Sequence, residues 1–327
     1  MNLSTVSVIV PAYNAAETLP ICLAALAKQT YLTTHYEVIV VDDGSADLTA
    51  TIAQDHGCRL VQLPHNQGRS AARNAGAHAA TGDLLLFTDA DCEPLPDWIA
   101  QMVAPFEQDA ALVGVKGAYL CKQRSLIARF TQLEFEEKYR ELARHPQISF
   151  IDTYSAAYRR ILFLANGGFD TTLNYSLLED QDFSFRLAAQ GLKMVFAPHA
   201  RVYHHHLTSP TRYYWRKWLI GRWKTVILRR YPARRDNDSR TPFSLKLQFG
   251  IALLLIANFV AMFVFWPLVW LLPLLLLLFT ATCLPFLRET ARADRMVLLV
   301  ALPMLFVRAF GLAHGYIDGT IRLRKIR

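Results

Sequence analysis

The segment Asp83-Leu-Leu-Leu-Phe-Thr-Asp89-Ala-Asp91 places a short apolar run directly before two acidic residues. The run has the length and composition of a buried β-strand. Side chains two positions apart in an extended chain point the same way, so the carboxylates of Asp89 and Asp91 are expected on one side. Two hard oxygen ligands suit Mg²⁺ or Mn²⁺, with substrate phosphates completing the coordination shell. In isolation, such a pair is more readily explained as a solvated turn after a strand.

The first 200 residues alternate between short β-rich runs and helix-like stretches. Strands are expected over Val6–Pro11, Glu37–Val41, Arg59–Gln62, Asp83–Thr88, Leu112–Tyr119, Met194–Ala197 and Arg201–His205, and helices over Ala15–Gln29, Asp47–His56, Ile127–Ala143 and Glu179–Gln190. This alternation predicts an α/β domain whose mostly parallel sheet is covered by helices on both faces. Ligands of such sheets bind at the carboxyl ends of the strands.

Two more polar segments follow expected strands at that same edge. Asp42-Asp43-Gly44-Ser45 closes the second strand, and Pro11-Ala12-Tyr13-Asn14 closes the first. Ser45 is expected to cap the next helix. Asp42 and Asp43 are also explained if they merely favour the positive N-terminus of that helix. With Asp89 and Asp91, however, three strands direct polar groups into one crevice.

Between these segments lies Asn66-Gln-Gly-Arg-Ser-Ala-Ala-Arg73-Asn74-Ala-Gly76. Gly68 and Gly76 are expected to bracket a short helix. Arg69 and Arg73 are four residues apart and therefore share one face of it. A guanidinium there can contact a phosphate or a base, although the segment alone is more readily explained as a surface helix with two solvated arginines.

The charge distribution divides the chain into three parts. Residues 1–200 contain 15 Lys and Arg against 22 Asp and Glu, residues 201–242 contain 11 against 2, and residues 243–327 contain 9 against 3. An acidic front half followed by a basic collar disfavours nucleic acid as a partner and suits a domain tethered beside an anionic lipid surface. The five cysteines match no zinc or redox spacing, which fits a reducing compartment.

The composition becomes strongly apolar after the collar. Leu247–Leu287 contains no charged residue, and its 41 residues suggest two membrane helices with a turn at Trp266–Pro267. Met296–Ile317 is also apolar but contains Arg308 and His314, so an interfacial or re-entrant helix is favoured over a third span. The N-terminus lacks the basic and apolar regions of a signal peptide. We therefore expect a multi-pass protein of the cytoplasmic (inner) membrane, with its first domain in the cytoplasm.

Four of these motifs together resemble glycosyltransferase family 2. They are Ser7–Asn14, Val40–Ser45, Asn66–Gly76 and Thr88–Asp91, which stand in order at the family's spacings over a similarity spanning roughly residues 5–230. The resemblance implies a Rossmann-like GT-A nucleotide-diphospho-sugar transferase fold, followed here by C-terminal transmembrane helices. It also implies a UDP- or GDP-linked sugar donor and a divalent Mg²⁺ or Mn²⁺ ion.

The same resemblance implies roles for individual residues. Donor contacts fall on Pro11, Ala12, Tyr13, Asp42, Asp43, Arg73, Asp89 and Ala90, and metal contacts on Asp89 and Asp91. Leu178-Glu179-Asp180 resembles the family's acidic motif at a helix start, which makes Asp180 the general base beside Glu179. Alternatively, these acids only stabilise the helix N-terminus.

His204-His205-His206 follows the last expected strand. Related enzymes place a late histidine at the metal or the diphosphate, and His204 is the preferred candidate. His204 and His206 are expected on one face, so either could reach the ion. A surface histidine cluster near the lipid interface explains the triplet equally well.

The expected organisation is a GT-A domain over 1–209, a basic aromatic interfacial segment over 210–242, a transmembrane hairpin over 243–290 and a third hydrophobic helix with a basic tail over 291–327. The expected function is inverting transfer of one sugar to a membrane lipid or a lipid-linked glycan. A polyprenyl-phosphate acceptor and a non-catalytic nucleotide-sugar-binding scaffold remain alternatives. Leu219-Ile-Gly-Arg222-Trp223 lacks the glutamine of processive synthases, which disfavours a processive enzyme. No Gly-x-Gly-x-x-Gly follows the first strand, which disfavours a dinucleotide oxidoreductase.

Overall fold

The computed structural model describes residues 4–173, 178–232 and 242–323. The chain divides into two compact units. The first comprises Met1–Lys122 and Leu142–His205, and the second comprises Gln123–Glu141 and His206–Arg327. Residues 123–141 therefore belong to the second unit, whereas the sequence analysis included them in the GT-A domain over 1–209.

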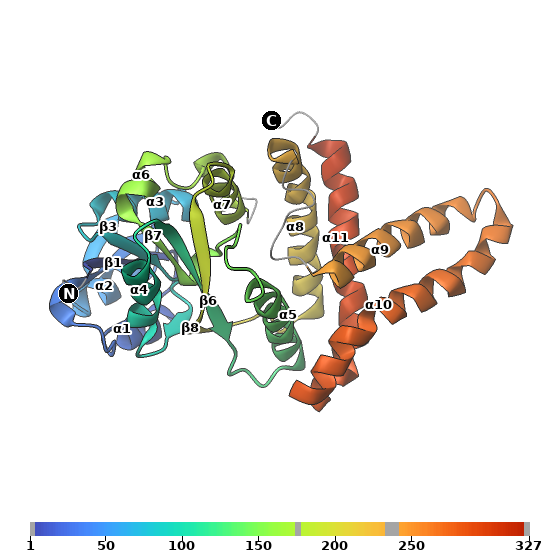
Figure 1. Cartoon of the computed structure of the whole chain (residues 1–327), viewed down its shortest axis with the longest axis horizontal. Helices are drawn as coiled ribbons and strands as arrows, with labels where there is room; N and C mark the ends of the chain where they lie inside the picture. Colours follow the sequence, from blue (N-terminus) through green and yellow to red (C-terminus); the bar gives the residue numbers. More distant parts are fainter. Residues whose placement is uncertain (1–3, 174–177, 233–241, 324–327) are drawn as a thin grey trace. The chain divides into compact units, whose positions relative to one another are not determined.

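The first unit is an α/β domain, as expected. Its strands are β1 (Val6–Ala12), β2 (Tyr36–Asp42), β3 (Arg59–Gln62), β4 (Leu84–Phe87), β5 (Cys92–Pro94), β6 (Leu112–Leu120), β7 (Ala156–Arg159) and β8 (Lys193–His204). Its helices are α1 (Leu19–Leu26), α2 (Thr49–Asp55), α3 (Arg69–Ala79), α4 (Trp98–Gln108), α6 (Arg160–Ala165) and α7 (Glu179–Ala189). The elements are labelled in Figure 1.

The eight strands form one sheet in the order β3-β2-β1-β4-β7-β6-β8-β5. The first four strands of this order are parallel. The other half makes the sheet mixed: β6 and β8 are parallel, but β7 runs antiparallel to β4 and β6, and β5 runs antiparallel to β8. The two late strands expected from the sequence are one strand, β8, whose pairing with β6 shifts register between them.

Helix α3 packs closely on the parallel half of the sheet, against β1 and β2. Gly76 was expected to end this helix but lies inside it. A Cβ at this position would meet Ile9 Cγ2 at 2.5 Å, so the glycine permits the close contact between helix and sheet. This contact holds α3 beside the strand ends that follow β1 and β2.

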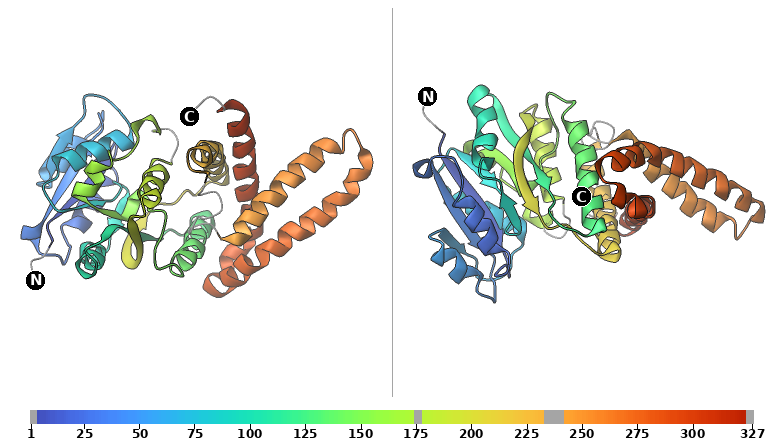
Figure 2. Two further views of the ribbon diagram at one scale, coloured as in Figure 1. Left: turned by 45° about the horizontal axis from the view of Figure 1, so that its top comes forward. Right: turned by 90° about the horizontal axis from the view of Figure 1, so that it is seen from below.

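The second unit contains only helices among the residues described. They are α5 (Leu126–Leu142), α8 (Pro210–Arg230), α9 (Phe243–Ala261), the short helix η5 (Trp266–Trp270), α10 (Leu271–Ala293), the short helix η6 (Arg295–Val297) and α11 (Leu298–Arg322). Helices α9 and α10 form the expected hairpin, which stays together in all views, and η5 contains the expected turn at Trp266–Pro267 (Figures 1 and 2).

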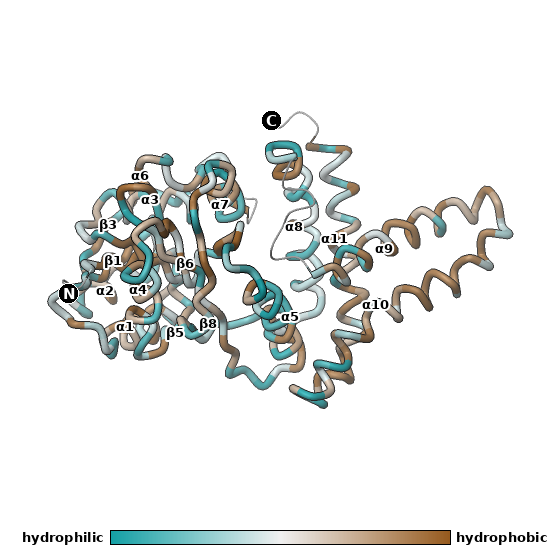
Figure 3. Tube along the Cα trace, viewed as in Figure 1, coloured by the Kyte–Doolittle hydropathy of each residue, from teal (hydrophilic) through white to brown (hydrophobic). Residues whose placement is uncertain are grey.

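Three helices of this unit are long and apolar enough to cross a membrane. They cover Phe243–Ala261, Trp266–Ala293 and Arg295–Arg322. In Figure 3 most of the trace of the hairpin has the brown colour of hydrophobic residues. By length and composition, these helices indicate membrane association.

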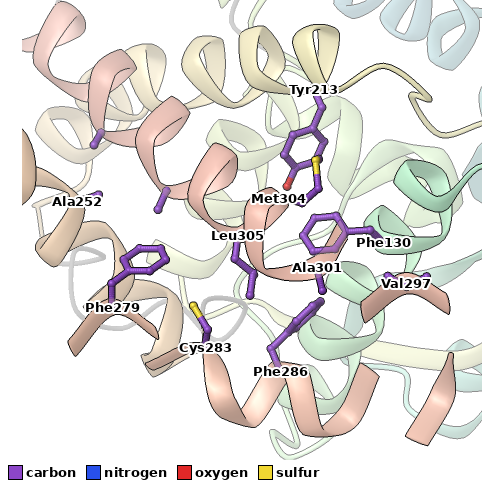
Figure 4. Close-up of a cluster of buried hydrophobic side chains, with 12 residues drawn as sticks. Phe130, Tyr213, Ala252, Phe279, Cys283, Phe286, Val297, Ala301, Met304 and Leu305 are labelled. Carbon is purple, nitrogen blue, oxygen red and sulfur yellow. The ribbon is translucent and has the colours of Figure 1, made fainter. Parts of the chain in front are cut away.

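A single apolar core joins the helices of the second unit (Figure 4). Helix α5 contributes Phe130, α8 contributes Tyr213, and α10 contributes Phe279 and Phe286. Further members are Ala252 from α9, Cys283 from α10 and Ala301, Met304 and Leu305 from α11. Helix α5 is therefore an integral part of this helical unit, because Phe130 lies in this core and Leu126, Ile127 and Leu133 pack against it.

Candidate active site

The loops after β1 and β2 are held together by backbone hydrogen bonds to side chains. The Asn14 N–H donates to Ser45 Oγ at 2.9 Å, and the Ala46 N–H donates to Asn14 Oδ1 at 2.9 Å. Ser45 therefore does not cap α2, whose N-cap residue is Leu48, so that expectation is wrong. Instead, Ser45 fixes the loop that presents Pro11–Tyr13, and Tyr13 is 51% exposed.

The two carboxylates after β2 shape neighbouring loops. Asp42 Oδ1 accepts from the Ser45 N–H at 3.0 Å. Asp43 accepts from the N–H groups of Gln67 and Gly68 at 2.7 and 2.9 Å, which ties β2 to the start of α3. Both aspartates are buried. Their visible contacts are thus loop-forming ones, made directly beside the crevice predicted from the sequence.

Arg73 joins two parts of the site that are distant in sequence. Its Nη2 donates to Asp89 Oδ1 at 2.7 Å, and its Nη1 donates to Glu179 Oε1 at 3.0 Å. The side chain is only 2% exposed, so its guanidinium is committed to two carboxylates. Arg69, one turn earlier, lies 3.9 Å from Glu179 through its Nε and is 47% exposed. The shared face of the two arginines predicted from their spacing is therefore confirmed.

Asp89 and Asp91 differ in their surroundings. Burial raises the pKa of Asp89, but the adjacent Arg73 guanidinium outweighs it and holds that pKa below its ordinary value. Asp91 Oδ2 lies 3.5 Å from His204 Nε2. His204 reaches this position because β8 pairs with β5 at Cys92, the residue after Asp91. Both aspartates thus lie at the same end of the sheet as His204.

The ring of His204 packs on Tyr119, which in turn stacks on Tyr154, and the sequence marked neither tyrosine. Tyr119 packs against His204 with ring centroids 4.3 Å apart, and it stacks on Tyr154 at 3.3 Å. Lys116 donates to the Tyr154 hydroxyl at 3.1 Å and pairs with Asp152. No local pattern marks these residues, since they come from β6 and from the segment before β7.

His206, the second candidate of the triplet, has its contacts in the helical unit. His206 belongs to the helical unit, where its Nε2 lies 3.0 Å from Gln132 Oε1 and its ring stacks on Phe135. Strand β8 ends at His204, so the alternation expected to place His204 and His206 on one face does not continue.

The acidic motif Glu179-Asp180 begins α7, as expected. Glu179 is buried against Arg73, whereas the side chain of Asp180 is partly exposed. Asp180 Oδ1 accepts from the Gln181 N–H at 2.7 Å. Asp182, one turn into the helix, pairs with Arg186 at 3.2 Å. Of these three acids, Glu179 and Asp182 are buried and Asp180 is the most accessible.

The residues present fit a divalent ion only together with a ligand. Among the residues that the structure describes, no group of three or more His, Cys, Asp and Glu side chains could hold a metal by itself. Asp91 and His204 offer an oxygen and a nitrogen 3.5 Å apart, a donor set that suits Mn²⁺ or Mg²⁺ when phosphate oxygens complete the shell.

The mixed α/β sheet, with polar groups gathered at the ends of its parallel strands, is that of a GT-A glycosyltransferase. Residues 7–165, just under half of the chain, match the model for "Glycosyl transferase family 2", so this segment is a family 2 glycosyltransferase domain. The sequence-based recognition, the fold class and the assignment as an enzyme are thereby confirmed.

Two curated relatives and one solved structure illustrate the similarity. The chain is 28% identical to a pre-mycofactocin glycosyltransferase of Mycobacterium tuberculosis over 69% of its length and 48% of the relative. It is 37% identical to an undecaprenyl-phosphate 4-deoxy-4-formamido-L-arabinose transferase of Photorhabdus laumondii over 36% of its length and 38% of the relative. A mannosyltransferase from Pyrobaculum calidifontis shares the fold over 98% of this chain and 88% of its own, with a TM-score of 0.60 and 20% identity. The chain spans less than half the length of these curated relatives.

Proposed function

We propose that this glycosyltransferase moves one sugar, with inversion, from a UDP- or GDP-linked donor to a membrane lipid or lipid-linked glycan at the cytoplasmic face of the membrane. The observation that carries the proposal is the bridge from Arg73 to Asp89 and Glu179. This bridge fixes the strand end that carries Asp91 relative to the helix start that carries Asp180. Binding of the donor and activation of the acceptor then occur at adjoining positions.

The donor contacts are assigned to the β1 and β2 loops. Tyr13 is exposed and offers a ring for the base, beside Pro11 and Ala12. Asp42 is assigned to the base, and Asp43 to the loop that surrounds it. Asp89, Ala90 and Asp91 approach the diphosphate, with Asp91 and His204 as the metal ligands. A bound Mg²⁺ or Mn²⁺ supplies positive charge that offsets the charge on the departing nucleoside diphosphate.

Asp180 is assigned as the general base. Its carboxylate takes the proton of the acceptor hydroxyl as that oxygen bonds to the anomeric carbon and the bond to the donor phosphate breaks. Glu179 holds Arg73 and is a positioning residue in this scheme. The solved complex of the Pyrobaculum mannosyltransferase with GDP-Man and Mn²⁺ supports a nucleotide-sugar donor and a divalent ion on the same fold.

The test is transfer from a panel of nucleotide sugars by the purified full chain, with and without EDTA. Asp91→Asn and Asp180→Asn are expected to lower kcat by at least about 100-fold, the size typical of lost acid–base or electrostatic catalysis. Asp55→Asn, an exposed carboxylate at the end of α2, is the matched control. Transfer that survives EDTA and Asp91→Asn would refute the mechanism, and tight donor binding without turnover would favour the non-catalytic scaffold.

A polyprenyl phosphate is the second candidate acceptor. The undecaprenyl-phosphate transferase relative favours it. The cationic helix α8 is also suited to a phosphorylated lipid, because it carries seven Lys and Arg residues and no acid. Organic extraction of the radiolabelled product followed by mild acid distinguishes the acceptors. A sugar linked directly to a polyprenyl phosphate is released as the free monosaccharide, whereas a sugar added to a glycan or a glycolipid keeps its glycosidic bond.

A further inference from the structure

Helix α11 has the length and mean hydropathy of a membrane span, yet it carries a buried arginine at its centre. Arg308 is the eleventh of its 25 residues and is 1% exposed. Its Nη1 donates to Glu134 Oε1 at 3.1 Å, and its Nη2 donates to Gln248 Oε1 at 2.6 Å. The counter-charge therefore comes from α5, outside the three apolar helices.

The partner helix α5 is unsuited to the interior of a bilayer. Besides Glu134, it carries five other charged residues between positions 136 and 141. If α11 crossed the membrane with Arg308 at mid-depth, the Arg308–Glu134 bond would bring those charges toward the hydrocarbon. Charged side chains at that depth are costly and need partners of their own.

Helix α8 lies against the C-terminal half of α11 and runs parallel to it (Figures 1 and 2). Gly311, Gly315 and Gly319 of α11 approach the backbones of Tyr214, Trp218 and Arg222 of α8, in that order. Arg222 also pairs with Asp318 at 3.2 Å. Helix α8 carries seven Lys and Arg residues, so this half of α11 is joined along its length to a highly cationic helix.

The α9–α10 hairpin is the opposite case. It has no charged residue from Leu247 to Leu287, and its tip exposes Phe263, Val264, Trp266 and Trp270. The rest of the protein buries only 22% and 17% of the most apolar windows of its two helices, against 44% for α11. The hairpin thus has a free apolar surface, whereas much of α11 is already covered.

We propose that the α9–α10 hairpin is the part of the described chain that enters the hydrocarbon, and that α11 does not cross it. Helix α11 instead lies with α5 and α8 at the level of the anionic headgroups, where their cations and aromatic rings are favourable. Both ends of α11 then lie on one side of the membrane, together with the glycosyltransferase unit. This arrangement does not depend on the proposed reaction.

The test is labelling of single cysteines by a membrane-impermeant maleimide in sealed vesicles of each orientation. The background carries Cys58→Ser and Cys121→Ser, which removes the partly exposed thiols. Met296→Cys and Ile321→Cys stand near the two ends of α11 and are 56% and 64% exposed in the wild-type chain. Both are expected to react from the same face as Ala27→Cys in the first unit. Reaction from opposite faces would overturn the proposal.

Trp266→Cys at the hairpin tip is the matched control, because Trp266 is 65% exposed and Ile321 64%. Any difference between them therefore reports shielding by lipid rather than by protein. Trp266→Cys is expected to react at least about tenfold more slowly than Ile321→Cys from the face of the catalytic unit; equal rates would overturn the insertion of the hairpin. Reporter fusions at the two termini of the unsubstituted chain provide a readout free of mutation, and reporters on opposite sides would also overturn it.

Discussion

Arg73 shows how one buried residue can join two parts of a site. Its two η nitrogens each donate to a different carboxylate, one at the end of β4 and one at the start of α7. A planar guanidinium can do this because its donors point in fixed, divergent directions, whereas an ammonium is a point charge. The resemblance implied a contact with the base or phosphates, but the buried side chain supports a positioning role instead.

Replacing Arg73 by Met is expected to lower the free energy of unfolding by about 3–5 kcal/mol, because Glu179 would be left buried without its counter-charge. Arg69→Met removes only an exposed, long contact to the same Glu179 and is expected to cost at most about 1 kcal/mol. Denaturant unfolding of the detergent-solubilised proteins measures both values. Equal losses in the two variants would contradict the bridge.

Arg73→Lys separates positioning from folding. It keeps the positive charge, so stability is expected to stay much closer to wild type than in Arg73→Met. An ammonium is a point charge and cannot reproduce the two fixed donor directions by which the guanidinium binds Asp89 and Glu179. We therefore expect kcat to fall about tenfold or more with little change in donor KM. A wild-type kcat in Arg73→Lys would exclude a positioning role.

Sequence reasoning at this scale identified residue types better than their partners. The spacing of Arg69 and Arg73 predicted a shared helix face, and the acidic motif predicted a helix start at Glu179. Their pairing was not predictable, because Arg73 and Glu179 are 106 residues apart and only the packing of α3 on the sheet brings them together. Tyr119 and Tyr154 were missed for the same reason.

Glu134 connects helices of the second unit, as Arg73 connects a strand end with a helix in the first. It accepts from the Tyr213 hydroxyl at 2.6 Å, from Lys217 at 3.2 Å and from Arg308 at 3.1 Å, and so connects α5 with α8 and α11. Burial raises the pKa of Glu134, but Lys217 and Arg308 outweigh it and lower that pKa from 4.5 to about 2. The ion cluster therefore depends on Glu134 staying ionised.

The depressed pKa of Glu134 predicts an acid-sensitive helical unit. A folded-state pKa below the unfolded value contributes stability at pH above 4.5, and that contribution disappears as the pH falls toward 2. A shift of this size corresponds to about 3 kcal/mol. Comparing unfolding of the wild type and Glu134→Gln between pH 5 and pH 2 measures it. The variant should lack this component of the slope, and parallel curves would refute the assignment.

A glycine of α11 and a glycine of α9 predict opposite effects of the same substitution to alanine. A Cβ on Gly315 would collide with the Trp218 carbonyl oxygen, whereas a Cβ on Gly250 of α9 meets nothing within 4 Å. Gly315→Ala is therefore expected to lower stability by about 1–3 kcal/mol through overpacking. Gly250→Ala is expected to raise it by up to about 1 kcal/mol, because alanine favours helix. Thermal unfolding in one detergent compares the two, and a stabilised Gly315→Ala would contradict the close α8–α11 contact.

Elements with strong local signals were predicted well. An uncharged run interrupted by Trp266–Pro267 was sufficient to place the hairpin and its turn. Strand β7 was missed, because four residues beginning Ala-Ala carry no strand pattern, and this strand is what makes the sheet mixed. Whether Arg308 was exposed or paired could not be inferred either, since Glu134 lies 174 positions away.

At the scale of the whole molecule, the chain passes between the two units three times, near residues 122, 141 and 205. The charge pattern predicted an acidic domain, a basic collar and apolar helices in that order. It did not predict that α5 leaves the domain around it, because an amphipathic helix has the same pattern whichever unit covers its apolar face. Because α5 lies between two segments of the first unit in the sequence, no single cut in the chain separates the two units.

A fragment ending at residue 205 should therefore fail to behave as an isolated domain. It retains α5 but lacks α8–α11, so Phe130 and the partly buried Leu126 and Leu133 lose the core that covers them. Glu134 would also lose all three of its hydrogen-bonding partners. Such a fragment is expected to bind hydrophobic dyes and to aggregate in size-exclusion chromatography. Phe130→Ser and Leu133→Ser in the same fragment should restore a monomer, because they remove exposed apolar surface without touching the sheet. A monomeric fragment with unaltered α5 would instead mean that this helix finds its apolar contacts elsewhere.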